Sequence, residues 1–174
     1  MKRKKVYLTC GIPGSGKTTW ILNELTKGGV NAWHSRDEVR FSMLKDGEEY
    51  FSKENAVFNK WINDIQASLA DESIENIYID ATHISENSRN KVLNRLNLTD
   101  VDIIPVVFNV PLKTCLKRNK LRTGRSKVPN TAIKNMYNTF STNHVSFNEK
   151  YHYKEIMYII EKGAPINVKS VSDL

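Results

Sequence analysis

Short apolar runs alternate with amphipathic stretches along the 174 residues of this chain. Four runs rich in β-branched and aromatic residues have the length of a buried strand: 5–10, 77–80, 103–108 and 156–160. A weaker strand candidate lies at 31–34. The clearest helix places Phe58, Trp61, Ile65 and Leu69 on one face, because their spacing follows the helical repeat.

Further helices are expected between and beyond these strands. Their ranges are 17–25, 35–44, 86–96, 111–123 and 129–140. Strands that alternate with helices favour a mostly parallel central sheet with helices on both faces, so the predicted fold class is three-layer α/β. Ligands of such folds bind beyond the carboxyl ends of the strands. We expect one domain over 1–174, with 161–174 as a tail or a minor edge element.

The stretch from Gly11 to Thr18 reads G-I-P-G-S-G-K-T, which satisfies the phosphate-binding pattern G-x-x-x-x-G-K-[ST] between a strand and a helix. The glycines let backbone N–H groups wrap the phosphates, and the helix places its positive dipole end there. A tight glycine turn is the plain alternative. The residues expected to bind the nucleotide are Gly14, Ser15, Gly16, Lys17, Thr18 and Thr19. Lys17 is expected to bridge the β- and γ-phosphates, and Thr18 to give its hydroxyl to Mg²⁺.

A second candidate site follows the strand at 31–34. Asp37 and Arg40 stand three residues apart and share one face if a helix begins there. A phosphoryl-transfer enzyme needs a base for the attacking hydroxyl and a cation for a nearby acceptor phosphate, and this pair fits both roles. The alternative is a plain helix start, since Ser35 and Glu38 form a capping box.

Positive charge is concentrated in one segment. The chain carries 26 Lys and Arg against 19 Asp and Glu, a net charge of +7. Seven of those cations, and no acid, lie between Lys113 and Lys127, which favours a phosphate or nucleic-acid partner. Arg118, Arg122 and Arg125 would share a face if one helix continued through Gly124. We therefore predict a basic helical lid at about 113–128, with Arg122 stabilising the transferred phosphoryl group.

These motifs together resemble the kinase domain of phage-type 5′-hydroxyl polynucleotide kinases. The shared order covers the phosphate loop through Trp20, the cluster from Arg36 to Arg40, the loop from Asp80 to His83, and the lid. The resemblance implies a P-loop kinase fold, with Asp37 as general base, Arg40 on the phosphate next to the acceptor nucleoside, and the lid arginines on the donor phosphates. It also implies acceptor contacts for Asp80, Thr82 and His83, although Asp80 could equally support Mg²⁺, orient Arg40 or cap the next turn. His83 departs from the family, which often has asparagine there, and the phosphatase motif of the two-activity enzymes is absent.

The predicted function is therefore transfer of the γ-phosphate of ATP, or another NTP, to the 5′-hydroxyl of DNA or RNA, as in nucleic acid end repair. Two alternatives are a kinase for a nucleoside, nucleotide or hydroxymethylated base, and a nucleotide-dependent switch without transferase activity. The two cysteines are far apart and suggest neither zinc nor a disulfide, which favours a cytoplasmic protein, phage-encoded if the resemblance extends to origin. No apolar run approaches the length of a membrane span.

Overall fold

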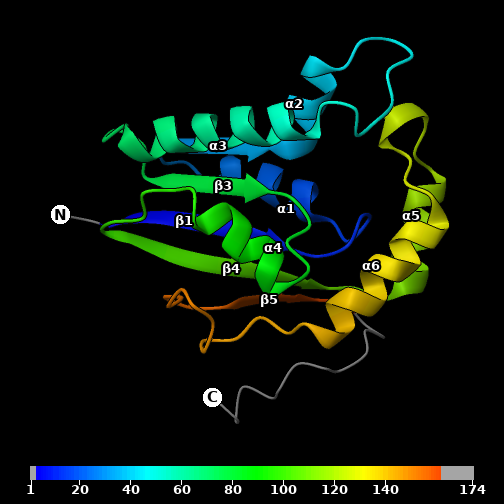
Figure 1. Cartoon of the computed structure of the whole chain (residues 1–174). Helices are drawn as coiled ribbons and strands as arrows, with labels where there is room; N and C mark the ends of the chain where they lie inside the picture. The colour runs from blue at the N-terminus through cyan, green and yellow to red at the C-terminus, as the bar shows by residue number, and fades with distance from the viewer. Residues whose placement is uncertain (1–2, 162–174) are drawn as a thin grey trace.

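The computed structural model describes residues 3–161 and contains a five-stranded sheet. The strands are β1 (Lys4–Cys10), β2 (Asn31–Ser35), β3 (Asn76–Asp80), β4 (Val101–Asn109) and β5 (Met157–Ile160). They run in the order β2-β3-β1-β4-β5, and every pair is parallel (Figure 1). The predicted α/β fold with a parallel sheet is confirmed, and all four predicted strand runs and the weaker one at 31–34 are strands.

Within residues 3–161, six α-helices and one 3₁₀ turn accompany the strands. They are α1 (Lys17–Leu25), α2 (Arg36–Met43), α3 (Glu54–Ala70), α4 (Glu86–Leu93), α5 (Leu112–Lys120), η1 (Gly124–Ser126) and α6 (Asn130–Thr142). The expected helix at 111–123 is wrong at its carboxyl end, because α5 ends at Lys120 and the chain turns before η1. Residues 162–174, most of the predicted tail, lie outside the described residues.

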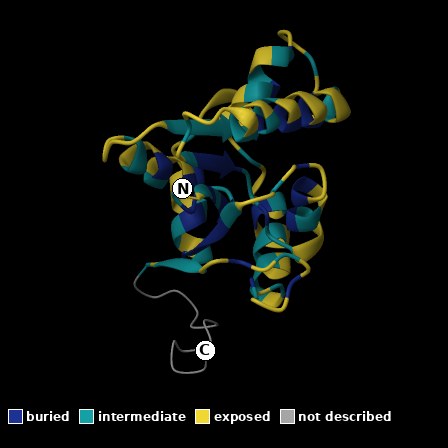
Figure 2. Cartoon of the chain, turned by 90° about the vertical axis from the view of Figure 1, so that its left-hand side faces the viewer, coloured by how far each residue is buried: buried dark blue, intermediate teal, exposed yellow. Residues whose placement is uncertain are grey.

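Alternating side chains of the sheet fill two hydrophobic clusters, one on each face. Val6, Leu8 and Cys10 of β1 pack with residues of α3 and α4. Tyr7, on the opposite face, belongs to the cluster that includes residues of α1, α5 and α6. The buried strands therefore lie between two helical layers, and the outer helix surfaces are exposed (Figure 2).

The parallel strands bring the predicted motifs to one edge of the sheet. β1 ends at the phosphate loop, β2 at the start of α2, and β3 at Asp80. β3 lies between β1 and β2 in the sheet, so all three motifs are neighbours in space. Among the helices in the described part of the chain, none combines the length and the apolar character that crossing a bilayer requires.

Candidate active site

The phosphate loop depends on two glycines with left-handed backbone angles. Gly14 has φ 84° and Gly16 has φ 96°, a region that other residues rarely adopt. A Cβ atom at Gly14 would also lie 2.7 Å from the carbonyl oxygen of Cys115 in α5. The loop therefore packs closely beneath the lid helix, and α1 begins directly after it, at Lys17.

Lys17, the first residue of α1, is buried against the phosphate loop. Its ammonium group donates a 2.9 Å hydrogen bond to the carbonyl oxygen of Ile12. Burial lowers the pKa of Lys17, and the positive charge of Arg122 lowers it further. The negative charges of Asp80 and Asp37 act in the opposite direction and raise it. Lys17, Arg122 and Asp37, the three predicted catalytic residues, are therefore close enough to interact electrostatically. The buried hydroxyl of Ser15 has no hydrogen-bond partner in the described residues, so it is available to a phosphate oxygen.

Thr18 and Asp80 bring two oxygen ligands together next to Lys17. The Thr18 hydroxyl donates a 2.8 Å hydrogen bond to Asp80 Oδ2, and Trp33 Nε1 donates to the same oxygen at 3.4 Å. Burial raises the pKa of Asp80, while Lys17 and the bond from Thr18 act in the opposite direction. Hydroxyl and carboxylate oxygens suit Mg²⁺, so these residues fit the expected ion. The bond between Asp80 and Thr18 supports a role on the donor side, and the predicted acceptor contact of Asp80 stays a prediction.

Asp37 and Arg40 form the predicted pair, but Arg40 is enclosed. The Asp37 side chain is 61% exposed, whereas that of Arg40 is 5% exposed. Arg40 Nη1 donates to Asp37 Oδ1 and, at 2.9 Å, to the Tyr50 hydroxyl, while Nη2 donates to Glu54 Oε2 at 2.9 Å. An acceptor phosphate would reach Arg40 only after one of these three partners moved. Glu54 also binds Arg36, so it holds both arginines of the motif.

The three lid arginines do not share one face, because the chain leaves the helix after Lys120. Arg118 Nη1 donates to the Gly14 carbonyl oxygen at 3.3 Å and therefore contacts the phosphate loop. Arg122 donates to Ser126 and lies within electrostatic range of Lys17. Arg125, predicted to bind the nucleotide, instead donates to the carbonyl oxygens of Leu44 at 3.4 Å and Lys45 at 2.5 Å. It thus joins the lid to the loop after α2.

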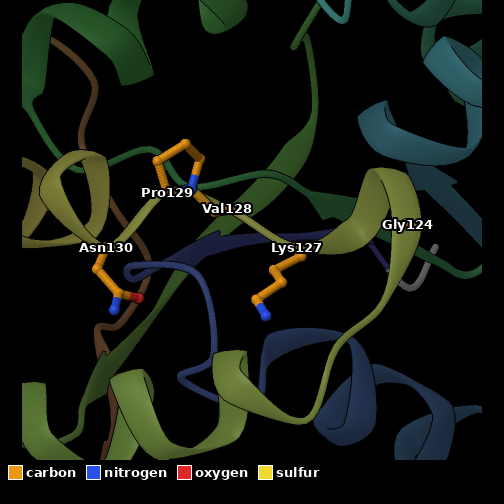
Figure 3. A pocket seen from close by; sticks show the side chains of 5 residues that line it. All are labelled: Gly124, Lys127, Val128, Pro129 and Asn130. Atoms are coloured by element: carbon orange, nitrogen blue, oxygen red, sulfur yellow. The ribbon is translucent and has the colours of Figure 1, made fainter.

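Asn119 explains why the lid turns where it does. This fully buried side chain donates to the Val128 carbonyl oxygen at 2.7 Å and accepts from the Val128 N–H at 3.0 Å. Both bonds draw the chain back after η1. The folded-back segment leaves an open hollow lined by Gly124, Lys127, Val128, Pro129 and Asn130 (Figure 3).

The predicted acceptor residues Thr82 and His83 contact the end of β1 and the start of the phosphate loop. The carbonyl oxygen of Thr82 accepts a 2.8 Å hydrogen bond from the Gly11 N–H. His83 is 3% exposed, and its Nδ1 lies 2.7 Å from the Thr9 carbonyl oxygen. Burial lowers the pKa of His83 to about 3, so the ring is neutral at physiological pH. The described contacts of both residues are structural, and their acceptor contacts stay a prediction.

Several residues near the site were not singled out from the sequence. Tyr50 and Glu54 enclose Arg40, although they lie outside the pattern Arg36 to Arg40. The fully buried Arg89 binds Glu149 through Nε at 3.0 Å and Nη2 at 2.6 Å, and donates to the carbonyl oxygen of His83 at 2.9 Å. The sequence around Arg89 gives no indication that it pairs with Glu149, which lies 60 positions further along the chain.

This arrangement defines a class of protein. The chain belongs to the AAA domain family, whose model matches residues 6–142. The family, the parallel sheet and the phosphate loop define a nucleotide-binding P-loop kinase domain, a phosphotransferase of the kinase type.

Individual relatives carry the comparison further. The L-seryl-tRNA(Sec) kinase of Methanococcus maripaludis is 29% identical over 187 residues, covering 97% of this chain and 69% of that protein. A chain of the Pnkp1/Rnl/Hen1 RNA repair complex superposes with a TM-score of 0.70 at 23% identity, covering 82% of this chain and 45% of that one. A fungal RNA kinase gives a TM-score of 0.61 at 14% identity, covering 95% and 78%. The structural similarities agree with the fold predicted from the polynucleotide kinase resemblance. This chain spans less than half the length of the matched chain of the RNA repair complex.

Proposed function

We propose that this chain is a 5′-hydroxyl polynucleotide kinase that transfers the γ-phosphate of ATP, or another NTP, to the end of a DNA or RNA strand. One observation carries the proposal: the exposed carboxylate of Asp37 lies within electrostatic range of the buried Lys17 of the phosphate loop. The candidate base for the acceptor and the candidate cation for the donor therefore interact electrostatically with each other.

The residues divide the chemistry between donor and acceptor. Lys17 and Arg122 would neutralise charge that develops on the transferred phosphoryl group, and the free Ser15 hydroxyl would bind a phosphate oxygen. Asp37 would accept the proton of the attacking hydroxyl. Thr18 and Asp80 would hold Mg²⁺, which supplies further neutralisation of the donor phosphates when bound.

The polymeric acceptor is supported by charge and by the relatives. Seven cations without an acid lie between Lys113 and Lys127, more than the phosphates of one nucleotide need. The three relatives described above have an RNA in their names: a tRNA kinase, an RNA repair complex and an RNA kinase. These names favour a nucleic acid over a free nucleoside as the acceptor.

A second candidate follows from the similarity to L-seryl-tRNA(Sec) kinase, which extends over 97% of this chain. In that case the acceptor would be the hydroxyl of a serine carried on a tRNA, and the same base, cation and lid would serve. The two candidates differ only in which hydroxyl lies at Asp37.

The test is transfer of label from γ-labelled ATP, with Mg²⁺, to a panel of acceptors. The panel holds matched 5′-hydroxyl and 5′-phosphate oligonucleotides of DNA and RNA, seryl-tRNA and free nucleosides. The proposal expects label only on 5′-hydroxyl oligonucleotides. Label on seryl-tRNA alone would support the second candidate, and label on nucleosides alone would exclude both.

A further inference from the structure

The loop between α2 and α3, residues 44–53, brings the hydroxyl of Tyr50 into hydrogen-bond contact with Asp37, the candidate base. The Tyr50 hydroxyl donates a 2.7 Å hydrogen bond to Asp37 Oδ1 and accepts one from Arg40 Nη1 at 2.9 Å. Arg40 Nη1 also donates to Asp37 Oδ1. The three groups form a closed triangle, and all described hydrogen bonds of the Asp37 carboxylate fall on Oδ1.

Such a triangle fixes a carboxylate in one orientation. Two donors hold Oδ1, which leaves Oδ2 as the oxygen for an acceptor hydroxyl. The Tyr50 ring is itself held, because the Arg40 guanidinium lies over it, 4.4 Å from its centroid, and Phe41 packs on it edge to face at 6.2 Å. Burial and the negative charge of Asp37 raise the pKa of Tyr50, so its hydroxyl keeps its proton and remains a donor.

Resting on the proposed role of Asp37 as base, we infer that Tyr50 is a positioning residue, which orients the Asp37 carboxylate so that Oδ2 meets the attacking hydroxyl. In this role its hydroxyl would act only through Asp37, without contact to the donor or the acceptor. Removal of that hydroxyl therefore lowers the rate of transfer without weakening the binding of either substrate.

The test is a double-mutant cycle of Tyr50→Phe and Asp37→Asn, with ATP and the acceptor that the wild type phosphorylates. Tyr50→Phe keeps the ring over Arg40 and should lower kcat ~10-fold with both KM values within about twofold. In the Asp37→Asn background it should have no further effect. Tyr158→Phe is the matched control, because this tyrosine lies on the edge strand β5 and its hydroxyl makes no described hydrogen bond.

Three outcomes would overturn this inference. Losses that multiply in the double variant would show that Tyr50 acts independently of Asp37. A rise in activity or a fall in acceptor KM for Tyr50→Phe would show that Tyr50 blocks the acceptor site instead. An unchanged kcat would show that the hydroxyl is dispensable. If no oligonucleotide accepts phosphate, the proposed function fails, and the same cycle is measured on ATP hydrolysis, where Asp37 orients the attacking water.

The next residue of this loop supports a second inference from a separate observation. Phe51 is 67% exposed and lies beside the candidate catalytic residues. Its ring stands edge to face with Tyr50 at 4.7 Å and 85°, and the Arg40 guanidinium lies 5.6 Å from its centroid. Backbone bonds from Ser52 to Glu49 and from Glu54 to Phe51 fold the chain on either side of it.

An exposed aromatic ring next to the acceptor groups suits a flat, aromatic ligand. Any nucleobase can stack on such a ring, whatever its sequence, and this contact is common in single-strand binding. Arg40 and Tyr50 each contact both the Phe51 ring and Asp37, the candidate base. Again resting on the proposed function, we infer that Phe51 stacks on the terminal nucleobase of the acceptor strand.

The experiment compares a normal 5′-hydroxyl oligonucleotide with one whose terminal nucleotide is abasic. Phe51→Ala should raise the KM for the normal acceptor ~10-fold, and the wild type should lose a similar factor on the abasic acceptor. The variant should then no longer distinguish the two acceptors. Phe147→Ala, an exposed phenylalanine of another loop, is the control and should behave as wild type.

Equal losses on both acceptors, or no loss at all, would overturn the stacking inference while transfer by the wild type still supported the proposed function. Binding of the same two oligonucleotides, measured by fluorescence anisotropy, gives the comparison without turnover. A wild type that binds both equally would also contradict the inference.

Discussion

The hydroxyl of Thr18, in the first turn of α1, and the carboxylate of Asp80, at the end of β3, are 62 positions apart and lie 2.8 Å from each other. Burial raises the pKa of Asp80, so its ionised form is disfavoured in the folded protein. The proton is bound more tightly in the folded than in the unfolded state, and this group's contribution to stability falls as pH rises above its ordinary titration range.

Asp80→Asn should therefore stabilise the ligand-free protein against unfolding and lower its activity at low Mg²⁺ concentrations, so that more Mg²⁺ is needed. Removal of a buried charge should raise Tm at pH 7 by about 2–4 °C. Loss of a metal ligand should raise the Mg²⁺ concentration needed for half-maximal transfer ~10-fold or more. Thermal melts and a Mg²⁺ titration check both effects. An unchanged Mg²⁺ requirement would instead favour the predicted acceptor contact of Asp80.

Arg122 and Arg125 should have separate effects, although both belong to the lid. Arg122→Ala should lower kcat ~100-fold, because Arg122 interacts electrostatically with Lys17 and is proposed to stabilise the transferred phosphoryl group. Arg125→Ala should mainly raise the acceptor KM, about fivefold, because Arg125 holds the backbone of Leu44 and Lys45 at the start of the loop that carries Tyr50. Steady-state kinetics with each substrate varied distinguish them. A larger change in ATP KM for Arg125→Ala would restore its predicted place on the nucleotide.

The buried ion pair between Arg89 and Glu149 should be essential for stability. Both side chains are at most 3% exposed, and Tyr153 also donates to Glu149, at 2.5 Å. Arg89→Met leaves the Glu149 carboxylate buried without its cation, which should cost ~3–5 kcal/mol in the free energy of unfolding. The control is the surface pair of Arg3 and Asp102, where Arg3→Ala should cost less than ~1 kcal/mol. Urea denaturation measures both, and equal losses would contradict this account.

His83 should make the protein sensitive to mild acid. Its pKa is lowered from 6.5 to about 3 by burial, so the unfolded chain takes up a proton between these values and the folded protein does not. Stability should therefore fall as pH decreases below 6.5, by ~2 kcal/mol at pH 5. Burial lowers the pKa of His34 as well, which adds to the effect in the same direction.

His83→Asn should remove most of this pH dependence, whereas His144→Asn, at an exposed position, should leave it unchanged. Urea midpoints at pH 7 and pH 5 give the comparison. A His83→Asn variant with the same decline as the wild type would show that other groups cause the acid sensitivity.

The sequence predicts which strands and motifs form the site, because parallel strands bring their carboxyl ends to the same edge of the sheet. Apolar β-branched runs identified the strands, and parallel strands must end at one edge, so the proximity of Lys17, Asp37 and Asp80 followed from the order of the motifs. The partner of Asp80 did not follow, because the choice between Thr18 and the acceptor depends on a rotamer.

Contacts of the loops and the lid could not be predicted. The loop at 44–53 has no periodic pattern that would place Tyr50 on Asp37. The lid departs from a continuous helix because the Asn119 side chain binds the backbone of Val128. A single asparagine in a basic helical stretch does not by itself predict such a turn. Arg125 consequently lies on a different surface from Arg118.

The central claim is that Asp37 is the base of a kinase that phosphorylates a 5′-hydroxyl end, and one comparison tests it most directly. Label transfer from γ-labelled ATP to a 5′-hydroxyl oligonucleotide is measured for the wild type and Asp37→Asn, together with the ATP affinity of each. The account predicts transfer by the wild type, a loss of ~10²–10⁴-fold for the variant, and an ATP Kd within about threefold. Normal transfer by Asp37→Asn, or a wild type that labels no 5′-hydroxyl end, would contradict it.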